Sequence, residues 1–248
     1  MGRGPGAGRH RIPIHFPAWD DRSANHVWKE YVERNHALGG GLRTIPVSRF
    51  LDKNVHGVSP VSPISAGMTP ADLALLRGLA SLYEDCSYFE ISKRRCESLD
   101  IMAGAARVCY ALMRPAEELR KTGIRCRYMY SMGAFSRDLE NVTAFSGDSN
   151  TFDFASPGRT FDIIFINNGH GYYRIVNDTR KAFEFLAHES SVIVWHDYSF
   201  FPEQIRYEVL AGILDGTDPQ YREQLFFVSQ TKCAIFLRQS LLERIPPK

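Results

Sequence analysis

The sequence predicts an α/β fold of the Rossmann-like, doubly wound kind, with a seven-stranded sheet that is mostly parallel and ends in an antiparallel hairpin. Two observations support this prediction. From residue 69 onward, short apolar strand-like runs alternate with helical segments, which is typical of a parallel sheet covered by helices. The last two strand-like runs, 225–229 and 232–237, are separated only by Gln230 and Thr231, and so short a gap requires an antiparallel hairpin.

The length and composition favour a single globular domain with appendages. The chain has 248 residues, of which 44% are hydrophobic and 23% charged, so a disordered chain is excluded. The formal net charge of +2 gives no global field that would attract nucleic acid or an anionic membrane. No apolar run approaches the roughly 18 residues that a membrane helix needs. The 5 cysteines lack metal-knuckle or CxxC spacing, which favours a reduced, cytoplasmic protein.

Residues 1–66 are predicted to form a flexible basic leader and an N-terminal wrap with one short helix. The first residues are rich in glycine and arginine and lack the apolar segment of a secretory signal. A helix is expected from Asn25 to Leu38, ended by the glycines 39–41, and the prolines at 46, 60 and 63 favour extended backbone after it. Residues 67–240 then form the α/β domain, and 241–248 a C-terminal tail.

Helix and strand signals become regular at Thr69. Thr69, Pro70 and Asp72 supply a capping hydroxyl, a proline at the first helical position and an acid in the first turn. Strands are expected at 87–91, 107–113, 141–145, 161–166 and 191–195, the last two almost wholly apolar, as in central parallel strands. Helices are expected up to about residue 103, from Pro115, and over 128–139, 172–186 and 202–214.

Polar residues follow the strands, and ligands of such sheets bind at the carboxyl ends of the strands. These candidates are Glu90, Ser92 and Ser98 for the first strand, Asp148 for the third, Asn167, Asn168 and His170 for the fourth, and His196 and Asp197 for the fifth. The side chain of His196 suits a general base near neutral pH, with Asp197 as its orienting group or as a metal ligand. The carboxylate of Asp148 suits accepting a hydrogen bond from an adenine amino group.

Plainer explanations stay open for each candidate. Glu90 is also explained as a solvent-facing strand end, Asp148 as the first residue of an Asx turn, and residues 167–170 as a turn. The pair of His196 and Asp197 is also explained as a salt-bridged corner. The remaining histidines are expected at the surface; they are residues 10, 15, 26, 36, 56 and 188.

The span from about residue 69 to 237 resembles class I S-adenosylmethionine-dependent methyltransferases. The resemblance is narrowest to a bacterial branch whose motifs read roughly FEIG-x-x-x-GES, IDGDH and WHDY. Here the matching stretches are FEIS at 89–92 with ES at 97–98, INNGH at 166–170 and WHDY at 195–198. The resemblance implies methyl transfer from S-adenosyl-L-methionine to an oxygen or nitrogen of a small-molecule acceptor.

The resemblance also implies roles for individual residues. It places Glu90 near the methionine amino end of the cofactor, Ser92 and Ser98 in the loop-to-helix turn and Asp148 near adenine. Two further cofactor-binding residues follow the fourth strand, Asn167 and His170. In metal-assisted relatives, ligands come from the ends of strands four and five, which implies a Mg²⁺ site formed by Asn167, His196 and Asp197.

Departures from the family motifs support an alternative, a catalytically silent binding protein on the same fold. Ser92 and Cys96 stand where the first motif has glycines, and Asn167 and Gly169 replace the acid pair of IDGDH. The second strand is followed by Arg114, with no acid to bind ribose hydroxyls. A third interpretation is a phosphate- or nucleic-acid-binding surface, formed by Lys93, Arg94, Arg95, Arg120, Lys121, Arg125 and Arg127. The oligomeric state stays open, a homo-oligomer included.

Overall fold

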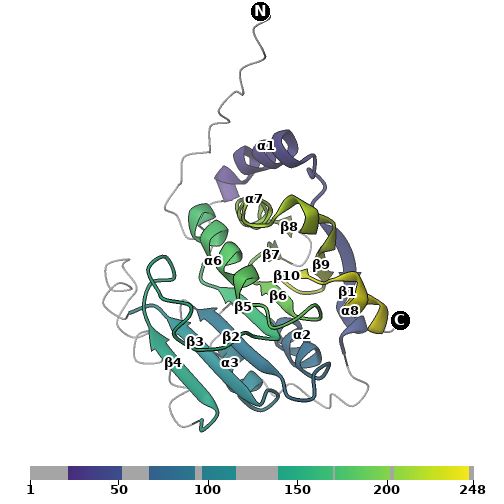
Figure 1. Ribbon diagram of the computed structural model, residues 1–248. Helices are drawn as coiled ribbons and strands as arrows, with labels where there is room; N and C mark the ends of the chain where they lie inside the picture. The colour runs from purple at the N-terminus through teal and green to yellow at the C-terminus, as the bar shows by residue number, and fades with distance from the viewer. Residues whose placement is uncertain are drawn as a thin grey trace, which may run out of the picture.

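The computed structural model of the chain describes residues 22–51, 67–92, 97–115, 139–169, 171–201 and 204–245. Its centre is an eight-stranded sheet in the order β1-β9-β10-β6-β5-β2-β3-β4 (Figure 1). All neighbouring strands in this sheet are parallel except β10, which is antiparallel to both β6 and β9. The predicted fold class, a doubly wound and mostly parallel α/β sheet with a C-terminal antiparallel hairpin, is confirmed.

The strand order reverses beside β2. The chain moves outward from β2 through β3 to β4, and then crosses to the other side of β2 to form β5 and β6. The switch point therefore lies between β2 and β5, where Ser92 and Asn167 are register partners at the carboxyl ends of their strands. The bounds of these strands are Ser87–Ser92 (β2), Val108–Met113 (β3), Val142–Ser146 (β4), Ile163–Asn167 (β5) and Val192–Trp195 (β6).

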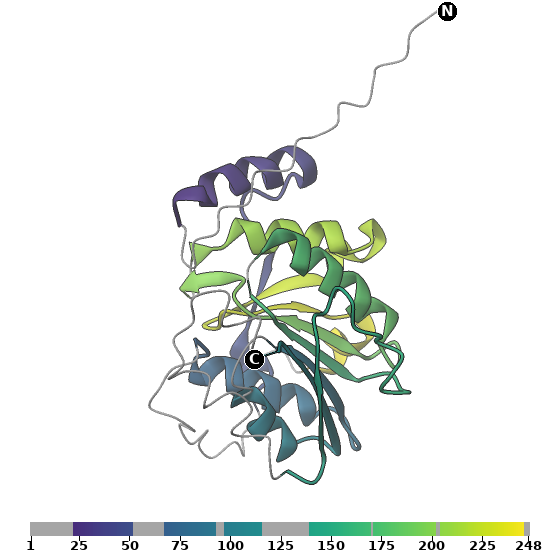
Figure 2. The ribbon, with the colours of Figure 1, turned by 90° about the vertical axis from the view of Figure 1, so that its left-hand side faces the viewer.

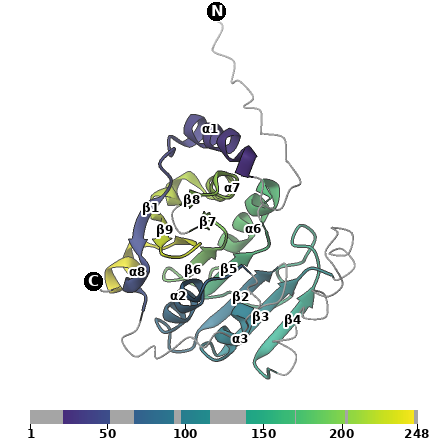
Figure 3. The ribbon, with the colours of Figure 1, turned by 180° about the vertical axis from the view of Figure 1, so that it is seen from behind.

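The sheet has one strand more than predicted. The predicted hairpin is present as β9 (Leu225–Ser229) and β10 (Ala234–Phe236). The additional strand is β1 (Arg43–Pro46), which runs parallel beside β9 at the sheet edge (Figure 3). These residues were assigned to the N-terminal wrap, because a four-residue run that ends in proline carries no strand pattern of its own.

Helices cover both faces of the sheet. In Figure 2, α1, α6 and α7 lie above the strands, and α2 and α3 lie below them. The helices are α1 (Asn25–His36), α2 (Pro70–Ala80), α3 (Glu97–Ala103), α6 (Tyr172–Glu184), α7 (Tyr207–Gly216) and α8 (Gln239–Arg244), with short 3-10 turns η1 (Arg22–Ala24), η2 (Val47–Arg49) and η3 (Pro219–Gln224). No described helix is long and apolar enough to cross a membrane.

One expected helix starts later than predicted, and two others fall outside the described residues. The helix expected to start at Pro202 starts instead at Tyr207, because a small two-stranded sheet precedes it, formed by β7 (Ser199–Phe201) and β8 (Gln204–Ile205). The segments expected to be helical from Pro115 and over 128–139 lie almost wholly in residues 116–138, outside the described ranges.

The buried apolar side chains of the strands divide between two core layers, one on each face of the sheet. On β2, Phe89 and Ile91 pack in the layer under α6 and α7, whereas Tyr88 packs in the layer under α2 and α3. Because side chains alternate along a strand, Glu90 belongs to the same face as Tyr88. Similarly, Val194 of β6 packs in the α2 layer, so the alternation carries His196 to that face as well.

Helix α7 packs closely against α6 through two glycines one turn apart. A Cβ atom at Gly212 would lie 2.8 Å from Cβ of Ile175, and one at Gly216 would lie 2.6 Å from Cβ of Thr179. Carbon atoms in a packed core are about 3.5–4.0 Å apart, so neither position has room for a side chain. This contact fixes α6, whose first turn reaches the carboxyl edge of the sheet.

Helix α1 is tied to α6 and α7 through Asp215. The hydroxyls of Tyr31 and Tyr172 donate to its Oδ2 at 2.7 and 2.6 Å, and Nε2 of His36 lies 3.1 Å from its Oδ1. Burial opposes ionisation of Asp215, but the hydrogen bonds from these three groups outweigh it and lower the pKa of the carboxyl to about 2. The expectation that His36 lies at the surface is wrong, since its side chain is only 4% exposed.

Candidate functional site

The predicted site residues that the structure describes lie at the carboxyl edge of the sheet or directly after it. Glu90, Ser92 and Asn167 lie at the carboxyl ends of β2 and β5, beside the switch point. Asp148 follows β4, and His196 with Asp197 follows β6. His170, the cysteine at 96 and the basic run 93–95 lie outside the described residues, as do the basic residues at 120, 121, 125 and 127.

Glu90 is fully buried, so the alternative of a solvent-facing strand end is wrong. Its Oε2 accepts hydrogen bonds from the hydroxyls of Tyr88 at 2.8 Å and Ser98 at 2.6 Å. Its Oε1 has no hydrogen-bond partner within the described part of the chain. Burial raises the pKa of the Glu90 carboxyl, although hydrogen bonds from Ser98, Tyr88 and Ser92 act in the opposite sense. A buried carboxylate with an unpaired oxygen is suited to receive a donor from a ligand.

Ser92 and Ser98 both lie close to this carboxylate in the sequence, and the side chains of both lower its pKa. Ser98, near the start of α3, is completely buried and donates its hydroxyl to Glu90. It therefore positions Glu90. Ser92 ends β2 opposite Asn167, at the switch point itself, and is 2% exposed.

His196 is buried between two carboxylates. Its Nε2 lies 3.4 Å from Oδ2 of Asp72, and its Nδ1 lies 3.4 Å from Oδ1 of Asp197. Burial alone would lower the pKa of the ring, but the charges and hydrogen bonds of Asp197 and Asp72 outweigh burial and raise the pKa of His196 to about 10. The ring is then an imidazolium at neutral pH. This does not fit the predicted role of general base, because a base must start deprotonated.

Asp72 also lies at the carboxyl edge of the sheet, beside His196, and the sequence did not predict this contact. It was interpreted only as an acid in the first turn of α2, and it does close a capping box: the Thr69 amide donates to its Oδ2 at 2.6 Å and its own amide donates to Thr69 Oγ1 at 3.2 Å. Its Oδ1 also accepts from the Lys232 amide at 2.7 Å. Burial opposes ionisation, but the bonds from His196, Thr69 and Lys232 lower the pKa of the Asp72 carboxyl.

Asp197 is the member of this pair that reaches solvent. Its side chain is 19% exposed, compared with 2% for His196. Its backbone φ is 60°, in the left-handed region, which costs a non-glycine residue about 1 kcal/mol. Such strain at the end of a buried strand is typical of functional positions.

The residues implied as Mg²⁺ ligands do not assemble a metal site. Within the described ranges, no group of three or more His, Cys, Asp or Glu side chains could hold a metal ion. Both ring nitrogens of His196 face carboxylates, and a protonated ring has no lone pair for a metal. The side-chain nitrogen of Asn167 lies 4.0 Å from Sδ of Met68. The donor set therefore does not fit Mg²⁺.

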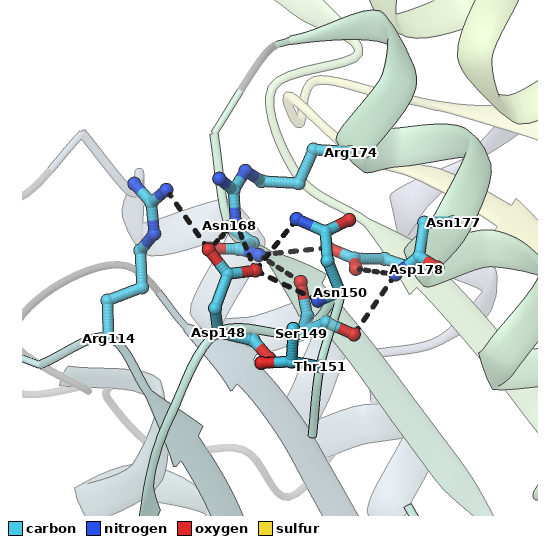
Figure 4. Close-up of polar contacts among 9 residues, drawn as sticks. All are labelled: Arg114, Asp148, Ser149, Asn150, Thr151, Asn168, Arg174, Asn177 and Asp178. Atoms are coloured by element: carbon cyan, nitrogen blue, oxygen red, sulfur yellow. Dashed lines mark hydrogen bonds and ion pairs between the residues drawn. The ribbon is translucent and has the colours of Figure 1, made fainter. Parts of the chain in front are cut away.

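Asp148 forms a network with two arginines (Figure 4). Its Oδ1 accepts from the amide and the side chain of Asn150 at 2.9 and 2.7 Å, so the Asx turn is present. Nη1 of Arg174 donates to both carboxylate oxygens at 3.1 and 3.2 Å, and Nη2 of Arg114 lies 3.9 Å from Oδ2. Burial opposes ionisation, but Asn150 and the two arginines lower the pKa of Asp148. An adenine amino group would have to share this occupied carboxylate.

A buried polar layer lies beneath Asp148. Asn168 is 3% exposed, and its Nδ2 donates to Ser149 Oγ at 2.9 Å and to Asp178 Oδ2 at 3.0 Å. Asn177 donates to the Ser149 carbonyl and to Asp178, both at 3.1 Å. Within the described part of the chain, Oδ1 of Asn168 has no partner. The role of Arg174 was missed, because nothing in a helix pattern shows which strand loop its side chain reaches.

Comparisons with known proteins give distant structural likenesses only. No protein-family profile matches the chain, and no curated protein sequence matches it. Similar solved structures include a putative O-methyltransferase from Klebsiella pneumoniae, with 16% identity and a TM-score of 0.43, and the O-methyltransferase from Bacillus cereus in complex with SAH, with 13% identity and a TM-score of 0.44. Each match covers 86% of this chain and 99% of the other.

A third similar structure is SAM-bound CalS10, an amino pentose methyltransferase from Micromonospora echinaspora. It is 17% identical with a TM-score of 0.37, and the match covers 54% of this chain and 50% of CalS10. The chain thus spans about half the length of that protein. Similarity this distant carries no assignment of residues or activity, so the function must be argued from the site itself.

Proposed function

We propose that the protein is an S-adenosylmethionine-dependent methyltransferase that acts on an oxygen or nitrogen of a small-molecule acceptor. The main support is the environment of Glu90: its carboxylate is buried beside the switch point, and its Oε1 accepts no hydrogen bond from the described residues. Doubly wound sheets bind their ligands at this point. The resemblance of the stretches 89–98, 166–170 and 195–198 to methyltransferase motifs supports the same reaction.

The chemistry of the cofactor suits this carboxylate. S-adenosylmethionine, when bound, supplies a methyl group made electrophilic by a sulfonium. Its methionine end carries an ammonium, and a cation beside Oε1 of Glu90 would supply the partner that this oxygen lacks. Tyr88 and Ser98 hold the other oxygen, so the carboxylate is oriented before the ligand arrives.

Asp197 is the better group to take a proton from the acceptor. In methyl transfer the acceptor atom bonds to the methyl carbon while the carbon–sulfur bond breaks, and the acceptor must lose its proton. His196 is held as an imidazolium by Asp197 and Asp72 together, so it cannot take this proton at neutral pH. Asp197 is an ionisable group at the same strand end, is more exposed, and has the His196 cation 3.4 Å away to orient it. His196 is then a positioning residue.

The test is methyl transfer itself. The purified chain would be incubated with S-adenosylmethionine carrying an isotope-labelled methyl group and a panel of phenols, amines and carboxylic acids, with labelled product and S-adenosylhomocysteine measured by mass spectrometry. We expect a labelled product, and a loss of about hundredfold or more in turnover for Asp197→Asn. The matched control, Asp85→Asn, changes an aspartate that is 70% exposed and precedes β2, at the opposite edge. If Asp197→Asn keeps full turnover, Asp197 is not the base.

A second candidate function is a catalytically silent binding protein. The observation in its favour is that charged side chains at this edge already have partners within the protein: Asp72 and Asp197 flank His196, and Arg174 contacts Asp148. In the same experiment this candidate predicts binding of S-adenosylmethionine with no labelled product and no S-adenosylhomocysteine from any acceptor.

A further inference from the structure

Asp197 has a left-handed backbone, with φ 60°, between two residues that the fold holds in place. On its N-terminal side, the His196 amide donates to the Ile166 carbonyl at 3.0 Å, which joins the end of β6 to β5. On its C-terminal side, the Tyr198 amide donates to the Lys232 carbonyl at 2.9 Å. A non-glycine residue keeps such a conformation only where the surrounding structure fixes it. The neighbours of Asp197 therefore fix the backbone that carries its side chain.

Tyr198 is held at three points. Besides the bond from its amide, its carbonyl accepts from the Arg206 amide at 2.8 Å, and its hydroxyl accepts from the Leu42 amide at 3.0 Å. Its ring is buried and stacks on that of Phe227 in β9, with the ring centroids 5.2 Å apart. Leu42 lies 156 residues away in the chain and directly precedes β1. Tyr198 therefore joins the end of β6 to the N-terminal part of the chain.

The N-terminal segment, residues 22–46, is fastened to the same stretch of chain at further points. Nδ2 of Asn25 in α1 donates to the Ile205 carbonyl at 3.0 Å, and Oδ1 of Asn25 accepts from the Tyr207 amide at 2.9 Å. The Tyr207 hydroxyl donates to the Gly39 carbonyl at 2.6 Å. Figures 1 and 3 show α1 beside α7, whose first residue is Tyr207. The N-terminal segment therefore contacts the chain that follows Asp197 along most of its length.

Gly41 brings the N-terminal segment into close contact with the Tyr198 side chain. Its φ is 82°, in the left-handed region that favours glycine. A Cβ atom at this position would lie 2.7 Å from the Tyr198 hydroxyl and would also overlap the side chain of Ile205. Atoms that close must move apart, because packed atoms lie about 3.5–4.0 Å from each other. A side chain at residue 41 would therefore displace Tyr198.

We propose that Tyr198 is a positioning residue for Asp197, and that the N-terminal segment belongs to the site through its bond to the Tyr198 hydroxyl. This inference rests on the proposed function, in which Asp197 takes the proton from the acceptor. A base must lie within hydrogen-bond distance of that proton, and a displacement of about 1 Å can lower turnover about a hundredfold. Loss of the bond between Leu42 and Tyr198 should therefore lower turnover. It should not change cofactor affinity, which is assigned to Glu90 on β2.

Two tyrosine variants of the full chain test the proposal by steady-state methyl transfer. Tyr198→Phe removes the hydroxyl beside Asp197, whereas the matched control, Tyr207→Phe, removes the hydroxyl that contacts Gly39 from the start of α7. We expect Tyr198→Phe to lower kcat about tenfold with KM for S-adenosylmethionine within about twofold, and Tyr207→Phe to keep both within about twofold. Circular dichroism would show that both variants are folded. An unchanged kcat for Tyr198→Phe, or equal losses in the two variants, would overturn the proposal.

A glycine pair tests the same contact from the other side. Gly41→Ala drives a methyl group against the Tyr198 hydroxyl at a left-handed position. The matched control, Gly158→Ala, has a φ of 65° and no atom within 4 Å of the added Cβ, so it carries the backbone strain without the collision. We expect kcat to fall about tenfold for Gly41→Ala and to stay within about twofold for Gly158→Ala. Equal effects of the two substitutions would show that strain, and not the displacement of Tyr198, lowers turnover, which would overturn the proposal.

Nuclear magnetic resonance gives a readout that needs no turnover. Nδ1 of His196 lies 3.4 Å from Oδ1 of Asp197, so the nitrogen chemical shifts of this ring report whether the carboxylate is in place. His196→Gln would assign the signals. We expect the signals to move in Tyr198→Phe and to keep their wild-type positions in Tyr207→Phe. Unchanged signals in Tyr198→Phe would overturn the positioning role, even if the wild type transfers methyl groups. Moved signals in a protein without methyl transfer would support that role and remove the proposed function.

Discussion

Among the described residues, two of the histidine–aspartate pairs lie at opposite edges of the central sheet. At the amino edge, Nε2 of His188 lies 2.7 Å from Oδ1 of Asp162, and the side chains are 47% and 12% exposed. At the carboxyl edge, His196 and Asp72 are farther apart, at 3.4 Å, but are 2% and 0% exposed, and Asp197 adds a second carboxylate. Burial and a second carboxylate therefore distinguish the carboxyl-edge pair, even though its contact distance is the longer one.

The two pairs also connect different parts of the fold. Oδ2 of Asp162 accepts the amide and the hydroxyl of Ser87, both at 2.7 Å, which ties β2 to the loop before β5. These hydrogen bonds have a structural role, because they hold the amino ends of β2 and β5 together. Asp72 and His196 instead connect α2 to the end of β6, at the edge where ligands of this fold bind.

The largest expected effect follows from removing the buried carboxylate. Asp72→Asn should lower the free energy of unfolding by about 3 kcal/mol or more, because it leaves the buried cation of His196 with one carboxylate fewer. Urea unfolding would measure the change. Asp218→Asn is the matched control for the capping role, since Asp218 is an exposed N-cap whose side chain accepts from the Gln220 amide. A loss for Asp72→Asn no larger than that for Asp218→Asn would contradict the account.

The corresponding change at the amino edge should have a smaller effect. Asp162→Asn removes the charge facing His188 but leaves an oxygen that can still accept from Ser87, so we expect a loss of about 1–2 kcal/mol. The same urea experiment compares the two variants directly. If Asp162→Asn destabilises the protein as much as Asp72→Asn, burial does not distinguish the two pairs.

The pH dependence of stability should also distinguish the carboxyl edge. The pKa of His196 is raised to about 10 by its two carboxylates, whereas an unfolded histidine titrates near about 6.5. The folded state therefore binds the proton more tightly. Its stabilisation is complete below the unfolded pKa and is lost as the pH rises through the folded one. Relative to His196→Gln, the wild type should lose stability between about pH 7 and 10. A difference that stays constant over this range would show that the imidazolium assignment is wrong.

The smallest effect is expected for the exposed imidazole. His188→Gln should change the free energy of unfolding by less than about 1 kcal/mol, because water screens a polar contact whose histidine is about half exposed. Thermal denaturation would detect a shift of that size. A loss comparable to that of Asp72→Asn would mean that the amino-edge pair is the more important one.

The local patterns of the sequence were sufficient for most of the fold. Alternating apolar runs predicted β2, β3, β5 and β6, and a two-residue gap predicted the hairpin of β9 and β10. Because parallel strands share one carboxyl edge, the sequence also predicted which polar residues would lie at the same edge as Glu90 and His196. These are consequences of chain order and side-chain periodicity, which a sequence displays directly.

Local patterns could not predict contacts between residues that are far apart in the sequence. The strand β1 exists because Arg43 and its neighbours pair with β9, starting at Phe226, and its own four residues do not predict it. Asp72 lies 124 residues from His196 in the chain, so its capping role was visible and its charge pairing was not. The protonation of His196 depends on burial between carboxylates from two elements, which no local pattern contains.

If Glu90 lies in a cofactor site, its charge contributes to binding, and calorimetric titration of S-adenosylmethionine into wild type and Glu90→Gln measures that contribution. We expect micromolar binding by the wild type and about tenfold or more weaker binding by Glu90→Gln, which loses the charge facing the ammonium. The control, Glu189→Gln, alters a side chain that is 84% exposed and should bind as the wild type does. A folded wild type that does not bind, or a Glu90→Gln variant that binds as tightly as the wild type, would contradict the account.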